Sequence, residues 1–179
     1  ARSILGDARS SEMQSKMNLK IKYRESFRPF APAVRIEDLS EWFEIEHASP
    51  YMVFVADVSG ERRQDAGKEE ASVTGLERLK SIRSDVPAVT HVDCSARIQS
   101  VDAENNPRFH RLLSRFNEKH GCPVMVNTSF NVRGEPMVCT PKDAYLCFMR
   151  TQMDYLLLGN YLLDKKELSK VSEIVEWDV

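Results

Sequence analysis

In the second half of the chain, apolar runs of strand length alternate with signals for the start of a helix. Of all the sequence features, this alternation restricts the possible folds most strongly. Apolar residues among Thr and Ser at 90–101 predict a strand, and apolar runs at 123–126 and 155–163 have the length of strands. An Asn-Pro pair at 106–107 and a Thr-Pro pair at 140–141 each place a capping side chain before a proline that suits the first helical position. Strands that alternate with helices predict an α/β or α+β domain built on a twisted sheet.

The helix predicted after the Asn-Pro pair has a regular apolar stripe. Its apolar residues recur at positions i, i+3, i+4 and i+7, at Phe109, Leu112, Leu113 and Phe116. Gly121 follows as a helix-ending residue, and a second helix is predicted from 141 to about 152.

The first half gives shorter signals. We expect a short helix through Met13 and Met17, and a strand where polar and apolar residues alternate from Lys20. An amphipathic helix over 36–45 and a strand over 51–58 should follow. Residues 59–85 carry many charges among few large apolar side chains, which predicts a solvated excursion within one domain that spans 1–179.

Composition excludes several classes of protein. The net charge of -2 argues against a general nucleic-acid binder, so no nucleic-acid partner is expected. The spacings of the four cysteines fit no zinc framework, which favours reduced thiols in a cytoplasmic protein. No apolar run approaches the ~18 residues of a membrane span, so no membrane partner is expected. The chain has no Met start and opens in structured sequence without a signal peptide, so we expect a fragment of a larger protein.

The first candidate site is a basic run at 20–28. Four cations fall within nine residues, beside the single acid Glu25. On a strand, Lys20, Lys22 and Arg24 would point to one face and repel one another unless an anion lay between them. A phosphate fits, because Arg offers a flat two-pronged donor and Lys a point charge. The alternative is a solvated strand face, the usual place of charged residues.

Two further segments carry polar side chains. Residues 127–131 (Asn-Thr-Ser-Phe-Asn) follow the apolar run at 123–126, where ligands of α/β sheets often bind, and the alternative is a loop bonded to its own backbone. On a regular strand His91, Asp93 and Arg97 would share a face, either as a reactive cluster or as an exposed ion pair of little energetic value.

Four segments together resemble a known family. They are ARSILGDARSSEMQSKMN at 1–18, KIKYRESFRPFAPAV at 20–34, AVTHVDCSARIQSV at 88–101 and NTSFNVRGEPMVCTPKDA at 127–144. They look like the C-terminal domain of the O-carbamoyltransferases, which act on nodulation factors and antibiotics. The resemblance covers nearly everything outside the charged excursion. One departure is Cys94-Ser95, where family members often carry Gly-Thr.

The resemblance implies a YrdC-like α/β fold with a twisted mixed sheet and a positively charged cavity. In this family, carbamoyl phosphate and ATP, which is carried with Mg²⁺, yield carbamoyl-adenylate in that cavity. An N-terminal transferase domain of the same polypeptide, which holds a further metal, then passes the carbamoyl group to an acceptor hydroxyl. That domain is absent from this sequence, and the acceptor is not readable from it.

Site residues follow from the matched motifs. The resemblance implies catalytic roles for Lys22, Arg28 and Arg97, and no metal ligand. It implies substrate or ATP binding by five more residues: Arg24, Asn127, Ser129, Asn131 and Arg133. Two other functions stay open at this point, namely a nucleotide- and phosphate-binding module that is inactive on its own and a YrdC-like factor of tRNA modification.

Overall fold

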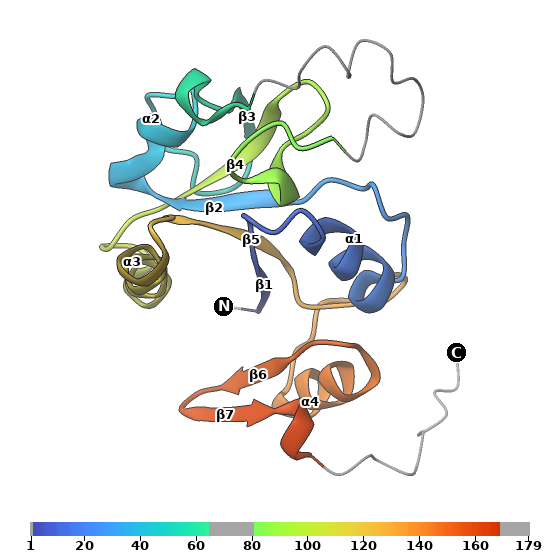
Figure 1. Ribbon diagram of the computed structural model, residues 1–179. Coiled ribbons are helices and arrows are strands. Elements are labelled where there is room, and N and C mark those ends of the chain that lie inside the picture. The colour runs from blue at the N-terminus through green and yellow to red at the C-terminus, as the bar shows by residue number, and fades with distance from the viewer. Residues whose placement is uncertain (1, 65–80, 169–179) are drawn as a thin grey trace.

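A computed structural model of the chain describes residues 2–64 and 81–168. Its centre is a five-stranded mixed sheet of order β1-β5-β2-β4-β3 (Figure 1). Strands β2 and β4 run parallel, and every other neighbouring pair in this sheet is antiparallel. The strands are β1 (Ser3–Asp7), β2 (Ala31–Arg35), β3 (Phe54–Asp57), β4 (Ser95–Val101) and β5 (Val124–Ser129). The predicted α/β class with a mixed sheet is therefore confirmed.

Helices pack on both faces of the sheet. They are α1 (Met13–Met17), α2 (Leu39–Trp42), α3 (Pro107–His120) and α4 (Pro141–Arg150). On one face Ala33 and Val101 pack with Phe109 and Leu113 of α3. On the other face β2, β4 and β5 contribute to the main core, which also includes residues of α1, α2 and α4. Each fully buried aliphatic side chain adds roughly 1.5–3 kcal/mol to the stability of this arrangement.

The two long helices begin and end close to the predicted residues, although the Asn106 side chain makes no capping hydrogen bond. Pro107 stands at the start of α3, and Gly121 ends that helix at φ 67°, with its N–H bonded to the Asn117 carbonyl at 2.7 Å. At α4 the Thr140 hydroxyl accepts a hydrogen bond from the Asp143 N–H, and the Asp143 carboxylate accepts one from the Thr140 N–H. This reciprocal capping box confirms the predicted helix start.

The strand predicted from Lys20 is wrong. Residues Asn18–Lys22 form a π-helical turn that continues α1, and Tyr23 closes it at φ 50°. The polar–apolar alternation misled the prediction, because Met17 and Ile21, four positions apart, are both buried as on one side of a helix. The cations of this segment therefore do not share one strand face.

The apolar run at 155–163 is a hairpin rather than one strand. Strands β6 (Tyr155–Leu158) and β7 (Tyr161–Asp164) pair around a two-residue turn, in which Gly159 has φ 60°. A Gly-Asn pair between apolar runs is a known hairpin signal. The hairpin packs on α4, away from the central sheet (Figure 1).

The charged excursion predicted over 59–85 is described only at its ends, and its middle, residues 65–80, lies outside the described residues. The two ends meet at a bridge between Arg63 and Ser84. Arg63 also pairs with Glu44 and Asp57, each at 3.0 Å. Within the described ranges, the structure holds no helix that is long and apolar enough to cross a membrane.

Candidate functional site

Strand pairing assembles the candidate site on the sheet face that α3 partly covers. Asn127 of β5 pairs with Leu5 on one side and with Ala31 on the other. Arg97 of β4 pairs with Val55 of the edge strand. Side chains alternate along a strand, so Ala31 lies on the same face as Ala33, which packs under α3. The site therefore occupies the end of this face that α3 leaves open.

A cleft of about 800 Å³ opens at this end of the sheet. Four arginines line it, and no aspartate or glutamate does: Arg2, Arg24, Arg28 and Arg97. We call this site the basic cleft. Hydroxyl and amide groups come from the end of β5, including Asn127 and Ser129, and Met52 and Met137 add apolar surface. Such a combination can bind a ligand that joins phosphates to a flat apolar ring.

Arg97 is the most available cation of the basic cleft. Its side chain is exposed on β4, between buried neighbours, and makes no hydrogen bond or ion pair within the described part of the chain. A guanidinium has five N–H donors that match a phosphate in pairs. Among the described residues, Arg97 thus offers a guanidinium without a partner to an anion.

Arg2 belongs to the basic cleft although sequence reasoning missed it. Its Nη1 donates to the Val138 carbonyl at 3.0 Å, and its own carbonyl accepts from the Phe130 N–H at 2.9 Å. A lone arginine beside the first strand gives no local pattern that marks a site. Only the pairing of β1 with β5 brings it to the end of β5.

Arg24 and Arg28 carry positive charge into the cleft from the segment before β2. Arg24 donates from Nε to Asn18 Oδ1 at 2.6 Å, and its guanidinium lies 4.7 Å from the centre of the Phe30 ring. Burial lowers the pKa of Arg24, and the neighbouring charge of Arg28 lowers it further. Arg28 is 4.0 Å from the Glu25 carboxylate and is well exposed. A bound anion would relieve the repulsion between these two cations.

Lys22 is buried behind the cleft instead of lining it. Its ammonium donates to the Asn131 carbonyl at 3.0 Å, to Asn131 Oδ1 at 2.9 Å, to Ser129 Oγ at 3.3 Å and to the Ser129 carbonyl. Burial, with the charge of Arg24 as a smaller cause, lowers the pKa of Lys22 to about 8. These contacts fix the end of β5, whose Ser129 faces the cleft.

Asn127 and Ser129 lie on β5 itself, so the expectation that they follow the strand is wrong by three residues. The strand extends because these residues pair with Leu5 and Ser3 of β1, a long-range contact with no local signal. Asn127 donates to Gln99 Oε1 at 2.6 Å. Arg133 lies outside the cleft lining, with its guanidinium 3.9 Å from Glu25 and largely exposed.

His91 and Asp93 do not share a strand face with Arg97, so that prediction is wrong. Strand β4 begins only at Ser95. Before it, Asp93 Oδ1 accepts from the Ser95 N–H at 3.0 Å and from its hydroxyl at 2.7 Å, and Cys94 has φ 63°. These bonds to the local backbone favour a turn over a strand. Burial lowers the pKa of His91.

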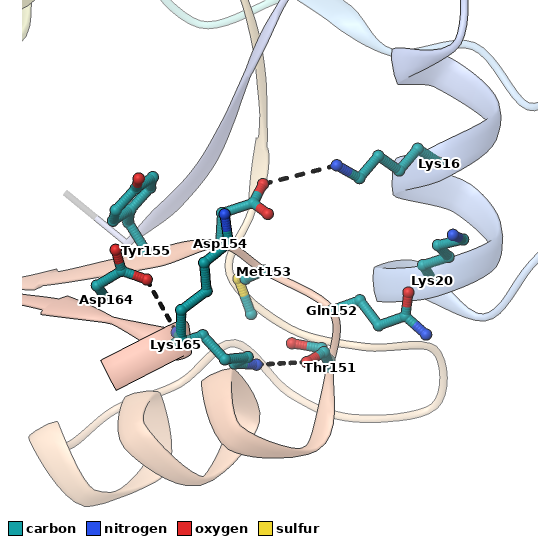
Figure 2. Close-up of a pocket in the computed structure, with 10 residues that line it drawn as sticks. Lys16, Lys20, Thr151, Gln152, Met153, Asp154, Tyr155, Asp164 and Lys165 are labelled. Atoms are coloured by element: carbon teal, nitrogen blue, oxygen red, sulfur yellow. Dashed lines mark hydrogen bonds and ion pairs between the residues drawn. The ribbon is translucent and has the colours of Figure 1, made fainter. Parts of the chain in front are cut away.

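A second cavity, of about 440 Å³, lies between α1 and the hairpin layer (Figure 2). Its lining includes carboxylates as well as lysines, and Lys16 lies 3.7 Å from Asp154. The Lys165 ammonium is bonded to the carbonyls of Phe148 and Thr151. Lys16 and Lys165 thus have partners within the protein, and the lining carries Asp154 and Asp164, which sets this cavity apart from the basic cleft.

The basic cleft has few carboxylates near it, so it offers few ligands for a metal ion. Among the described residues, no three His, Cys, Asp or Glu side chains gather as a metal-binding group. The donors of the cleft suit the oxygens of a phosphate rather than a bare cation. A magnesium ion would fit here only as the companion of a polyphosphate.

Comparisons with known proteins agree with these motifs. A sequence profile described as Carbamoyltransferase C-terminus matches residues 1–165. The chain belongs to the carbamoyltransferase C-terminal family. The family resemblance of the four sequence segments is thereby confirmed.

Three relatives show how far the similarity to this carbamoyltransferase family extends. The chain is 56% identical over 176 residues to the uncharacterized protein sll1178 of Synechocystis sp., covering 98% of the chain and 29% of that protein. It is 36% identical to nodulation protein NolO of Bradyrhizobium diazoefficiens, with 94% and 28% coverage. It is also 36% identical to the 3'-hydroxymethylcephem-O-carbamoyltransferase of Amycolatopsis lactamdurans, with 93% and 28% coverage. The chain thus spans less than a third of the length of these relatives.

Proposed function

We propose that this chain is the adenylate-forming part of a carbamoyltransferase, and that the basic cleft binds ATP and carbamoyl phosphate. The observation that carries the proposal is the set of four arginines that meet there with no acidic residue in the lining. Family membership supports the carbamoyl group as the one transferred.

The proposed chemistry joins two anions. Carbamoyl phosphate gives carbamate and phosphate with water, and a carbamate oxygen then attacks the α-phosphorus of ATP. The new oxygen–phosphorus bond forms as the bond to the β-phosphate breaks, so that carbamoyl-adenylate and pyrophosphate result. Repulsion between the reactants has to be offset and their atoms aligned, which calls for fixed cations more than for acid–base groups.

Each cleft residue has a part in this proposal. Arg97 and Arg28, which are both exposed, bind phosphate oxygens, and Arg24 adds positive charge. Asn127 and Ser129 offer amide and hydroxyl groups from the end of β5. Met52 and Met137 supply the apolar surface for the adenine base. Lys22 acts through Ser129 and Asn131, so we assign it a positioning role in place of a direct phosphate contact.

Magnesium is part of the proposal only as the partner of ATP. Mg²⁺ often keeps several waters and rides on substrate phosphates, where it shares their charge. The cleft residues would then hold the nucleotide and not the ion. Transfer of the carbamoyl group to an acceptor hydroxyl is proposed for the part of the polypeptide that the relatives have beyond this chain.

Calorimetric titration tests the binding step. ATP with Mg²⁺, and then carbamoyl phosphate, are titrated into the wild-type chain, Arg97→Ala and Arg115→Ala. Arg115 is a matched control, since it is exposed on α3 and its partner among the described residues is Glu118 at 2.7 Å. We expect binding that Arg97→Ala weakens roughly 10-fold or more, because one charge-assisted hydrogen bond contributes about 1.5–3 kcal/mol. Arg115→Ala should bind as the wild type does.

Exchange of labelled pyrophosphate into ATP tests the chemical step. Exchange that depends on carbamoyl phosphate and is lost in Arg97→Ala would support adenylate formation. Tight binding without exchange would favour the module that is inactive on its own. Equal affinity for ATP in wild type and Arg97→Ala would show that the basic cleft is not the nucleotide site.

A further inference from the structure

The β6–β7 hairpin exposes large apolar side chains to solvent. Leu157 and Leu162 are directly paired across the two strands, so they lie on the same face, and each is 67% exposed. Tyr155, two residues before Leu157, shares that face at 59% exposure. Three adjoining large side chains thus form an open apolar surface, which we call the hairpin face.

The opposite face of the hairpin is covered at its centre, although Tyr161 on that face is 78% exposed. Leu156 is 3% exposed, and it packs in the main core with Phe148 of α4, while Leu163 packs against that core. The hairpin therefore has apolar side chains on both sides, and burial is confined to the centre of one side. An isolated two-stranded hairpin is marginally stable in water, and packing of this hairpin against α4 supplies its support. Contiguous apolar surface of this kind marks a contact site.

The first described residues lead toward the hairpin layer. Arg2 is bonded through its carbonyl to Phe130 and through Nη1 to Val138, which both lie in the segment between β5 and α4. Helix α4, at the end of that segment, packs on β6. A polypeptide that precedes Arg2 would thus start close to the layer that carries the hairpin face (Figure 1).

The relatives have a long stretch of polypeptide to place. This chain covers 22–29% of the three top relatives, and the matching profile describes the C-terminus of the family. A tethered segment reaches an effective concentration in the millimolar range, far above that of a second copy in dilute solution. An apolar surface beside the tether is therefore covered by the attached polypeptide before another copy can reach it.

We infer that the hairpin face, made of Tyr155, Leu157 and Leu162, is the docking surface for the polypeptide that precedes residue 1 in the full-length protein. The partner surface is apolar, and the contact fixes the preceding domain relative to the basic cleft. The inference does not depend on adenylate chemistry in the cleft.

Photo-crosslinking in the full-length polypeptide tests this contact. Leu162→p-benzoylphenylalanine places the probe on the hairpin face, and Leu112→p-benzoylphenylalanine places it on α3 as an exposed control. We expect Leu162 to cross-link within the same polypeptide, to peptides upstream of residue 1, and Leu112 to give at least ten times less of that product. Cross-links from Leu162 to another copy, to residues 169–179 alone, or to no peptide would overturn the inference.

A second variant guards against a local effect of the probe. Leu157→Arg with Leu162→Arg places two charges on the hairpin face, while Leu112→Arg places one on α3. In small-angle scattering of the full-length polypeptide, the double variant should show a larger radius of gyration, and Leu112→Arg should match the wild type. A double variant that stays folded and equally compact would contradict the inference, whatever the outcome of the ATP experiments.

Discussion

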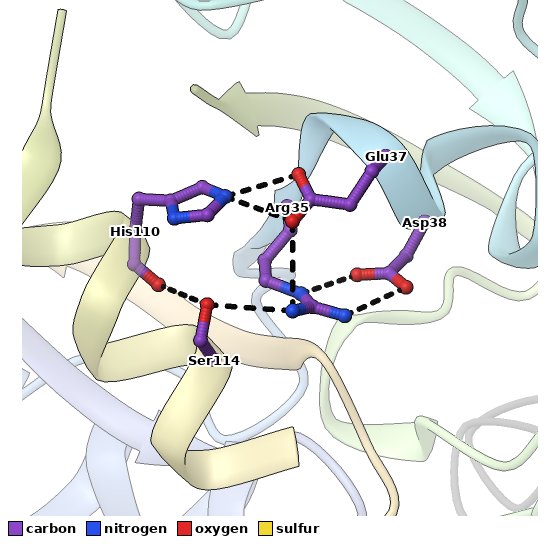
Figure 3. A network of polar contacts seen from close by, with 5 residues as sticks. All are labelled: Arg35, Glu37, Asp38, His110 and Ser114. Atoms are coloured by element: carbon purple, nitrogen blue, oxygen red, sulfur yellow. Dashed lines mark hydrogen bonds and ion pairs between the residues drawn. The ribbon is translucent and has the colours of Figure 1, made fainter. Parts of the chain in front are cut away.

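Two groups of arginines differ in how the protein treats their charge. Arg35, at the end of β2, binds Asp38 through Nε at 2.5 Å and through Nη2 at 2.9 Å, and Glu37 lies 3.5 Å away (Figure 3). Its Nη1 also reaches Ser114 of α3 at 3.3 Å. The four arginines of the basic cleft line a space without any carboxylate. The first group is neutralised from within the fold, whereas in the second Arg28 comes no nearer than 4.0 Å to Glu25 and the cleft itself is left for a ligand.

The difference teaches how a structural arginine is told from a binding one. Hydrogen bonding to Asp38 raises the pKa of Arg35, so folding favours its charged form. Burial and a like charge lower the pKa of Arg24, so the cleft raises the free energy of its charge. An anion would compensate the second arrangement and would add nothing to the first. The predictions below separate the two groups.

The largest effect is expected from removing two cations of the basic cleft. Arg28→Ala with Arg97→Ala should weaken ATP binding by roughly 100-fold or more, since each lost charge-assisted bond costs about 1.5–3 kcal/mol. Calorimetry gives the affinity, and urea unfolding gives the stability, which should stay within about 0.5 kcal/mol of wild type. A variant that unfolds more easily but still binds ATP would mean that these two arginines stabilise the fold and do not bind the ligand.

The next effect is expected in stability alone. Arg35→Met leaves the half-buried Asp38 carboxylate without its two-pronged partner and should lower the free energy of unfolding by about 1–3 kcal/mol. ATP affinity should not change, because the Arg35 network lies outside the cleft lining. Urea unfolding and calorimetry of Arg35→Met test this prediction. A loss of ATP affinity without a loss of stability would contradict the structural role assigned to Arg35.

Lys22 should add a pH dependence to stability. Its pKa is about 8 in the fold against 10.5 for an ordinary lysine, so between these values the unfolded chain binds more protons. The free energy of unfolding should therefore rise with pH in this window, and below pH 8 the contribution should be flat. Lys22→Met removes the titrating ammonium. The difference in free energy of unfolding between wild type and variant, measured in urea at pH 7.5 and 9.5, therefore gives the contribution of Lys22. A difference that stays constant or falls would refute the lowered pKa.

The smallest effect is expected at Arg115. Its pair with Glu118 is exposed, and such pairs contribute about 0–1 kcal/mol. Arg115→Ala should change the free energy of unfolding by less than about 0.5 kcal/mol and leave ATP affinity as it is. A larger change in urea unfolding would mean that exposed arginines of α3 cannot serve as controls.

Features of the structure that depend on interactions between residues close in the sequence could be predicted from the sequence. Thr140 and Asp143 form a capping box, and Gly121 ends a helix, because both effects depend on residues a few positions apart. Strand pairing is long-range, so the sequence did not reveal that Arg2 lies in the cleft or that β5 runs on to Ser129. The motif at 20–28 pointed to the correct region, but burial of Ile21 turned its first half into a helical turn and placed Lys22 behind the cleft.

The position of Arg2 couples ligand binding in the basic cleft to the docking of a preceding domain. Its guanidinium faces the basic cleft, while its backbone joins whatever polypeptide comes before it. A ligand that orders Arg2 would restrict the start of that polypeptide, and a docked domain would hold Arg2 in place in turn. Binding free energies that share one residue are linked equally in both directions. Ligand binding in the cleft would thus shift the position of the domain, and docking of the domain would change the affinity of the cleft for its ligand.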